Sequence, residues 1–352
     1  MPSSSPVPED APASHPRNRV FVTGAGFTRA LVQNAPLLID DFGNDALADR
    51  VRGLPHASRL LEWERNRHRK GHIDIERLMT RLESLMPYDH AEFADNAVNE
   101  YALLLSELKR SFLNRIREAE RGTVQWDDLN KFAGYCAKGL WHCVTFNYDD
   151  FLDQALATTL QWSPYGGYGF HCPSSLSTVA VWDEGISGSG LLLLKLHGSV
   201  NWRPKLGHAS PVPLNAITHH DSWSSTVGAN LPDVGNHLEP QPVMVPPVLS
   251  KSSLVEQPIL RLVWSHAFTV LQSAHEVTFL GYSFPATDIA ARTLFSEALK
   301  DLPRENIHVV NLASDDSHAE DIRTIYRSAL GDISEAQFHL DGALDWIRRL
   351  PT

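Results

Sequence analysis

The sequence predicts an α/β protein built on a doubly wound, mostly parallel sheet, and two observations lead to this fold class. Short apolar runs recur along the chain, and their unbroken hydrophobicity is typical of strands buried on both faces of a parallel sheet. Segments with apolar residues at helical spacing lie between several of these runs. Strands that alternate with helices in this way indicate a sheet with helices on both faces.

Five apolar runs are predicted to be strands of this sheet. They cover residues 19–23, 141–146, 191–196, 277–281 and 307–312, and a sixth short run covers 242–245. The first strand is followed at once by a glycine-rich turn and a predicted helix, which is the Rossmann-like arrangement.

The domain organisation is expected to be a single domain over residues 18–352. Residues 1–17 are rich in proline, serine and alanine without apolar periodicity, which predicts a disordered tail. Residues from about 44 to 138 show helical spacing and no convincing strand, so an all-helical insertion is expected there. Residues from about 203 to 240 are rich in proline, glycine, serine, asparagine and histidine, and we expect a long loop and candidate lid.

Composition excludes several classes of function. The net charge of −11 argues against direct nucleic-acid binding, which requires clustered lysine and arginine. No apolar run approaches the roughly 18–20 residues of a membrane span, and the N-terminal residues lack the features of a secretory signal. The three cysteines cannot form a disulfide framework without a leftover thiol, so the expected location is the cytoplasm.

The first candidate binding motif is the turn after the first predicted strand. Gly24, Ala25 and Gly26 lie between a strand and a helix, where the backbone can approach a pyrophosphate, and Thr28 follows in the first helical turn. The full dinucleotide fingerprint has a third glycine where this chain has Arg29. An ordinary glycine turn therefore stays open as the alternative.

The second motif contains Thr145, Asn147 and Asp149, at the end of the strand predicted over 141–146. Ligands of open α/β sheets bind beyond the carboxyl ends of the strands, so these polar side chains are candidate ligand contacts. The alternative is helix capping, which asparagine and aspartate also favour. For Asp150, directly before an apolar helical segment, the capping interpretation is preferred.

Three further strand ends carry candidate residues. His197 follows an apolar strand and precedes a glycine, and only this position distinguishes it among 17 histidines; an imidazole there can exchange a proton near neutral pH. Gly281 and Ser283 follow the fourth strand, and Asn311 lies late in the fifth. These last three residues are candidates for binding phosphate or a nucleoside, with ordinary turn chemistry as the alternative.

Taken in order, these motifs resemble those of the sirtuin superfamily, over about residues 20 to 312 in short islands. The matched elements are the Gly-Ala-Gly turn (Gly24, Ala25, Gly26), the Thr-x-Asn-x-Asp motif (Thr145, Asn147, Asp149), the His-Gly pair (His197, Gly198), the Gly-x-Ser motif (Gly281, Ser283) and the strand-end Asn311. The string Lys-Leu-His-Gly-Ser-Val-Asn-Trp at 195–202 resembles bacterial sirtuin-like proteins tied to antiphage defence.

The chain departs from the family in its cysteines. Typical deacetylases of the family hold a zinc ion with four cysteines in two Cys-x-x-Cys pairs. This chain has only Cys136, Cys143 and Cys172, so no zinc is expected. Phe146 stands where the family has glutamine, and Thr28 stands where the family has serine.

The resemblance implies an NAD hydrolase that cleaves the nicotinamide–ribose bond to give ADP-ribose and nicotinamide. In this interpretation Asn147 positions water or the ribose, His197 is the base, and Asp149 binds the carboxamide. The remaining matched residues hold the rest of NAD: Gly24, Ala25, Gly26, Thr28, Thr145, Gly281, Ser283 and Asn311.

The resemblance also implies a regulated, NAD-depleting effector of bacterial antiphage defence that forms a homo-oligomer. Only about 40 residues follow the last predicted strand, so a sensor or hexameric ATPase partner is expected to act in trans. Three alternatives stay open: a non-catalytic sensor of NAD or ADP-ribose, a structural subunit, and a protein deacylase.

Overall fold

The computed structural model describes most of the predicted domain. The described residues are 18–35, 51–67, 73, 75–83, 95–173, 190–205, 214–219, 242–245, 257–285 and 288–351. The predicted tail, most of the predicted loop at 203–240 and parts of the predicted insertion lie outside them.

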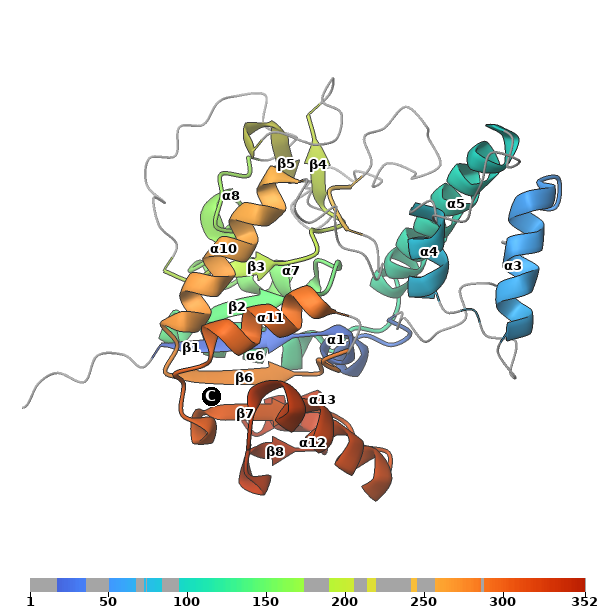
Figure 1. The fold of residues 1–352 in the computed structure, drawn as a ribbon. Coiled ribbons are helices and arrows are strands. Elements are labelled where there is room, and N and C mark those ends of the chain that lie inside the picture. Colours follow the sequence, from blue (N-terminus) through green and yellow to red (C-terminus); the bar gives the residue numbers. More distant parts are fainter. Residues whose placement is uncertain are drawn as a thin grey trace, which may run out of the picture.

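A six-stranded parallel sheet forms the centre of the molecule (Figure 1). Its spatial order is β3-β2-β1-β6-β7-β8, from β1 (Arg19–Thr23), β2 (His142–Thr145), β3 (Leu193–Lys195), β6 (Glu276–Leu280), β7 (Ile307–Val310) and β8 (Phe338–His339). In register, Val22 of β1 lies between Val144 of β2 and Phe279 of β6. The doubly wound α/β class predicted from the apolar runs is confirmed.

The strand predictions differ from the structure at two places. The run at 242–245 forms only an isolated bridge, between Met244 and Gly198. The strand β8 was not predicted, because it is two residues long and only half-buried, so it has no apolar run. β7 ends at Val310, which places Asn311 just beyond the strand.

Helices cover both faces of the sheet (Figure 1). One face carries α10 (Pro258–Gln272), α11 (Ile289–Ala298) and α12 (Asp316–Leu330), and the other carries α1 (Ala25–Leu31), α6 (Trp126–Gly139), α7 (Phe151–Ala157) and α13 (Ala343–Arg348). The ring of Phe21 on β1 contacts Phe132 of α6, and the ring of Phe279 on β6 contacts Phe295 of α11. Neighbouring strands therefore supply apolar side chains to both layers of the core.

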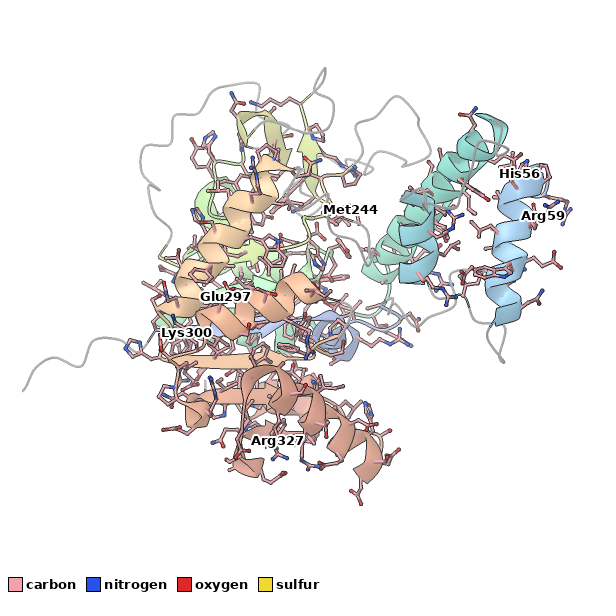
Figure 2. The ribbon with its side chains drawn as sticks, viewed as in Figure 1. His56, Arg59, Met244, Glu297, Lys300 and Arg327 are labelled. Atoms are coloured by element: carbon pink, nitrogen blue, oxygen red, sulfur yellow. The ribbon has the colours of Figure 1, made fainter. Side chains whose placement is uncertain are left out.

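Charged side chains lie on the outer surface of the helical layer. Figure 2 shows Glu297 of α11 and the nearby Lys300, both exposed, while Phe295 of the same helix is buried. This division between an apolar and a polar face is expected of a helix that packs on a sheet.

Three helices stand to one side of the sheet: α3 (Pro55–Arg67), α4 (Ile75–Glu83) and α5 (Asp95–Glu120) (Figure 1). The carboxylate of Glu100 on α5 accepts hydrogen bonds from the amides of His56 and Ala57, at the start of α3. A carboxylate at this end satisfies amides that have no partner within the helix. The insertion was predicted to reach about residue 138, but its last helix, α6, packs on the sheet. The helices that stand apart from the sheet therefore end at Glu120, the last residue of α5.

The segment after β3 forms a small antiparallel pair, β4 (Trp202–Pro204) with β5 (Ile217–His219). β5 lies inside the segment predicted as a loop. The remaining short elements are α8 (Pro164–Gly167) and the 3-10 turns η2 (Leu214–Ala216), η3 (Arg304–Asn306) and η4 (Glu335–Gln337). Among the helices that the structure describes, none is both long and apolar enough to cross a membrane.

Candidate functional site

The strand order predicts the point of the sheet at which a ligand would bind. The chain builds outward from β1 through β2 to β3, then crosses to the other side of β1 and continues through β6, β7 and β8. In open α/β sheets, ligands bind beyond the carboxyl strand ends where the winding reverses, here between β1 and β6. Gly24 follows β1 and Gly281 follows β6, so two predicted glycine motifs meet at this point.

The two glycine turns interlock. The amide of Gly24 donates to the Leu280 carbonyl (3.1 Å), and the amide of Gly26 donates to the Gly281 carbonyl (2.8 Å). A Cβ on Gly24 would lie 2.7 Å from Cα of Tyr282, and a Cβ on Gly26 would lie 2.8 Å from the Gly281 oxygen. These glycines therefore permit close packing of two turns, and two of the amides expected to face a pyrophosphate are bonded within the protein.

A chain of hydrogen bonds joins β1, α1 and the end of β2. The side-chain amide nitrogen of Asn147 donates to the Gly24 carbonyl and to the Thr28 hydroxyl, each at 2.9 Å. The Thr28 hydroxyl donates to Oδ2 of Asp149, also at 2.9 Å. The Gly24 carbonyl and the Thr28 hydroxyl oxygen both act as acceptors, so the NH₂ group of Asn147, and not its oxygen, must face them. These bonds fix the orientation of the Asn147 amide.

Thr145 extends this set of hydrogen bonds to the backbone of Asn147. Its Oγ1 accepts from the Asn147 backbone amide (3.1 Å) and lies 2.7 Å from the Thr23 hydroxyl oxygen. Thr145 is buried at the last position of β2, so its role in the structure is to hold Asn147 in place.

The carboxyl group of Asp149 has an altered acidity. Burial raises its pKa above the usual range, because removal from water penalises the charged form. The positive charge of Lys195 and the Thr28 hydrogen bond oppose this effect, and they leave a net upward shift of the pKa.

His197 follows β3 and faces an acidic side chain from the segment after β6, which lies on the far side of β1. Its Nε2 lies 3.6 Å from Oδ2 of Asp288, the residue at the N-cap of α11. His197 is 8% exposed and Asp288 is 4% exposed. His197 is thus placed at a strand end, as predicted, but it is largely covered by protein.

Aromatic rings form the surroundings of His197. The ring of Phe146 lies edge-on to the His197 ring at 5.2 Å and stacks on Tyr282 at 4.4 Å. The centroid of the Tyr148 ring lies 5.9 Å from that of His197. Phe146, which stands where the resemblance has a glutamine, therefore connects the turn after β6 with His197.

A buried ion pair lies beneath the second motif, and sequence reasoning missed it. The ammonium of Lys195, fully buried at the end of β3, donates to both carboxylate oxygens of Asp153 (3.0 and 3.2 Å) and to the Asp149 carbonyl. Tyr168 donates to Asp153, and Asn201 donates to Tyr168 (3.0 Å). Burial raises the pKa of Tyr168 well above its usual range, so its hydroxyl stays protonated as the donor.

Asn311 and Ser283 are both associated with Tyr282 in the turn after β6. The Asn311 side chain donates to the Tyr282 carbonyl (3.0 Å), and the buried hydroxyl of Tyr326 donates to the same oxygen (2.6 Å). Asn311 thus braces the turn, while Ser283 is exposed on it. Asp150 is the N-cap residue of α7, as predicted, but its side chain forms no capping hydrogen bond.

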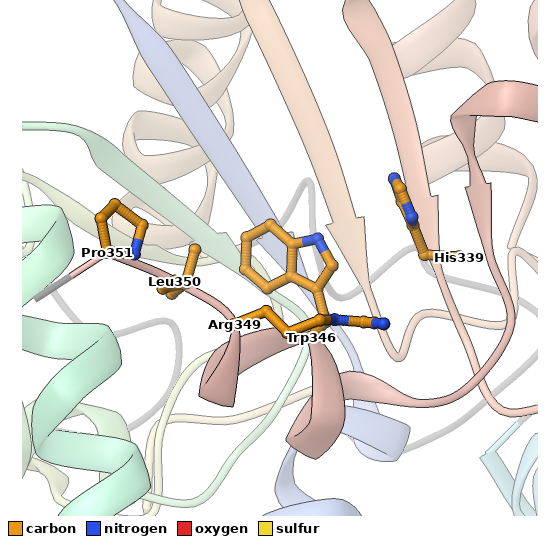
Figure 3. Close-up of a pocket in the computed structure, with 5 residues that line it drawn as sticks. All are labelled: His339, Trp346, Arg349, Leu350 and Pro351. Carbon is orange, nitrogen blue, oxygen red and sulfur yellow. The ribbon is translucent and has the colours of Figure 1, made fainter.

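A hollow of about 350 Å³ lies on the α13 side of the sheet, apart from these residues. Figure 3 shows its lining: His339, Trp346, Arg349, Leu350 and Pro351. None of the predicted site residues contributes to this hollow, so it is separate from the candidate site.

The cysteines occupy the core. Sγ of Cys136 and Sγ of Cys143 lie 3.8 Å apart, and all three thiols are buried. Within the described part of the chain, no three histidine, cysteine or acidic side chains are grouped as metal ligands.

Comparison with known proteins gives matches of structure alone. No family model and no curated protein matches the sequence. Similar solved structures include a Sir2 homolog in complex with NAD (TM-score 0.41, 14% identity, 94% of this chain and 88% of that chain). A mutant Sir2 homologue with ADP-ribose has a TM-score of 0.41 and 14% identity, and the match covers 94% of this chain and 90% of that chain. Sir2Tm bound to a propionylated peptide has a TM-score of 0.40 and 13% identity, and the match covers 95% of this chain and 91% of that chain. Values this low do not transfer the roles of individual residues.

Several of the predicted site residues form one hydrogen-bonded group, and His197 lies outside it. Gly24, Asn147, Thr28 and Asp149 are joined by hydrogen bonds beyond the carboxyl ends of β1 and β2. His197 is reached from this group through Phe146. Asp288 and Lys195 were not predicted, because the partners that define them are distant in sequence.

Proposed function

We propose that this protein binds NAD at the carboxyl ends of β1, β2 and β3 and cleaves the nicotinamide–ribose bond. One observation carries the proposal: the oriented amide of Asn147, at the end of β2, is bonded to Gly24 at the end of β1, the strand beside the reversal point, and a histidine follows the next strand, β3. The motif order described above supports the choice of NAD among dinucleotides.

The chemistry requires few groups. Nicotinamide leaves from a cationic ring as a neutral molecule, so its departure needs no general acid. The ribose passes through an oxocarbenium-like state, as in glycoside hydrolysis, and a nucleophile must then be delivered to it. The products with water as the nucleophile are ADP-ribose and nicotinamide.

Asn147 is suited to position the ribose or the attacking water. Its amide nitrogen is fixed by Gly24 and Thr28, which directs the side-chain oxygen away from these two acceptors. That oxygen can accept a hydrogen bond from a ribose hydroxyl or from water. His197 is the base that receives the proton, directly or through a ribose hydroxyl.

NAD fits this donor set when the covering rings move. Asp149 and Thr28 offer a carboxylate and a hydroxyl to the carboxamide and ribose, and the exposed Ser283 and the Asn311-braced turn offer polar groups to the rest. His197, however, is only 8% exposed. Cleavage therefore requires the rings beside it to move when NAD binds. We propose in addition that the activity is switchable rather than constant.

A switchable activity agrees with the proposed biological role. An unrestrained NAD hydrolase would exhaust the NAD of the cell that makes it. We therefore propose a regulated, NAD-depleting effector of bacterial antiphage defence, acting in the cytoplasm as a homo-oligomer. A sensor or hexameric ATPase partner would supply the trigger in trans.

The burial of His197 favours a second candidate function, the non-catalytic binding of NAD or ADP-ribose. Such a protein would keep the site residues and release no nicotinamide. The experiment that separates the two candidates is incubation of the purified full chain with NAD, followed by chromatography for nicotinamide and calorimetry for binding. Nicotinamide and ADP-ribose in equal amounts support the hydrolase; binding of NAD without either product supports the sensor.

A further inference from the structure

Asp288 holds a carboxylate in a fixed position beside His197. It is the N-cap residue of α11, and its Oδ1 accepts a hydrogen bond from the amide of Ala291 at 3.2 Å. Such a capping bond restrains the side chain, because the helix amide is itself immobile. The second carboxylate oxygen, Oδ2, then faces Nε2 of His197 at 3.6 Å.

Asp288 is a charged residue whose carboxylate faces this imidazole. The hydroxyl of the neighbouring Tyr148 donates to the Val245 carbonyl at 2.6 Å. The Lys195 ammonium, two residues before His197 in the chain, is bonded to Asp153 and to the Asp149 carbonyl. The surrounding rings of Phe146 and Tyr148 keep water away from the pair, which strengthens the attraction between opposite charges.

We propose that Asp288 is a positioning residue for His197: it orients the imidazole and stabilises the imidazolium that forms when His197 takes a proton. The inference deepens the proposed function and rests on it. The proton leaves the attacking water or a ribose hydroxyl, passes to His197, and the Asp288 carboxylate stays ionised throughout. At 3.6 Å the contact is longer than a hydrogen bond. The attraction grows when His197 takes a proton, because the imidazolium and the carboxylate then carry opposite charges.

The test replaces Asp288→Asn, which removes the charge and keeps a side-chain oxygen for the capping bond to Ala291. We expect kcat for nicotinamide release to fall about 10- to 1000-fold, the range that corresponds to loss of one nearby opposite charge. KM for NAD and the melting temperature should change little, and the acidic limb of the pH–rate profile should move to lower pH. Unchanged kcat and an unchanged profile would overturn the proposal.

Asp315→Asn is the matched control. Asp315 caps α12 in the same bonding pattern, accepting from the amide three residues later (His318, 2.9 Å), but it is exposed and lies on another helix. This variant changes one capping aspartate in the same way, so kcat and the pH–rate profile should stay as in the wild type. A loss equal to that of Asp288→Asn would show that the effect is not specific to the charge beside His197, and it would overturn the proposal.

A second measurement does not depend on NAD cleavage. The imidazole resonances of the 17 histidines are titrated by NMR, and the His197 signal is assigned by its loss in His197→Gln. In Asp288→Asn the midpoint of the His197 titration should fall by about one pH unit or more. An identical midpoint overturns the pair whatever the activity. A shifted midpoint in a protein that never releases nicotinamide keeps the pair and overturns the proposed function.

Discussion

The ring of Phe146, which follows β2, lies nearly parallel to the ring of Tyr282, which follows β6, with centroids 4.4 Å apart and an interplanar angle of 13°. β1 lies between these two strands in the sheet. The contact is possible because Gly24, at the end of β1, has no side chain: a Cβ there would lie 2.9 Å from Cδ2 of Tyr282. The glycine turn therefore helps to build the closed wall beside His197.

Gly281→Ala should destabilise the protein by about 2–5 kcal/mol. Gly281 has φ of +60°, and a Cβ there would lie 2.1 Å from the Phe27 amide nitrogen, so the substitution adds backbone strain to overpacking. Denaturant unfolding measures the change. Gly134→Ala in α6 is the control, because a Cβ at that position would have no neighbouring atom within 4 Å, and helix propensity favours alanine by about 1 kcal/mol. Equal stability of the two variants would contradict the interlocked turns.

Lys195→Met should lower the free energy of unfolding by about 3–5 kcal/mol, because the Asp153 carboxylate would be left buried without its counter-charge. Chemical denaturation of this variant beside Lys138→Met, an exposed position on α6, measures the difference; the control should change stability by less than about 0.5 kcal/mol. The double variant Lys195→Met with Asp153→Leu should recover part of the loss. A single variant as stable as the control would rule out the buried pair.

Asp149→Asn should raise the melting temperature at pH 7. Burial raises the folded-state pKa of Asp149, so the folded protein binds this proton more tightly than the unfolded chain. The stabilising contribution is present below the ordinary carboxyl pKa of about 4 and is lost as pH rises through the folded-state pKa. Melting curves of both proteins at pH 7 and near pH 4 test this: the advantage of asparagine should shrink at the lower pH. A variant less stable at pH 7 would contradict the sign of the shift.

The sequence was sufficient for the strands that carry the site. β1, β2, β3, β6 and β7 are buried over most of their length, so each leaves a mostly apolar run. β8 has two half-buried residues and no such run, and its pairing with β7 is visible only in three dimensions.

The positions of the site residues could be predicted from the sequence, but the contacts between them could not. Asn147 and His197 stand at strand ends, where motifs can be recognised. The pairs that define their surroundings join residues far apart in the chain, such as His197 with Asp288 and Lys195 with Asp153. No local pattern encodes such pairs, and the aspartate before α11 reads in sequence only as a helix cap. For the same reason, glycines interpreted as phosphate contacts turned out to have a packing role as well.

The most direct test of NAD cleavage at Asn147 and His197 is nicotinamide release by the purified full chain. Wild type, Asn147→Ala and His197→Ala are assayed in parallel with NAD, alone and with each candidate activating partner. We predict that wild type releases nicotinamide in at least one of these conditions, and that each variant, folded by its melting curve, is slower by about 10²–10⁴-fold. Variants that match an active wild type, or a wild type that binds NAD and releases no nicotinamide in any condition, would contradict this prediction.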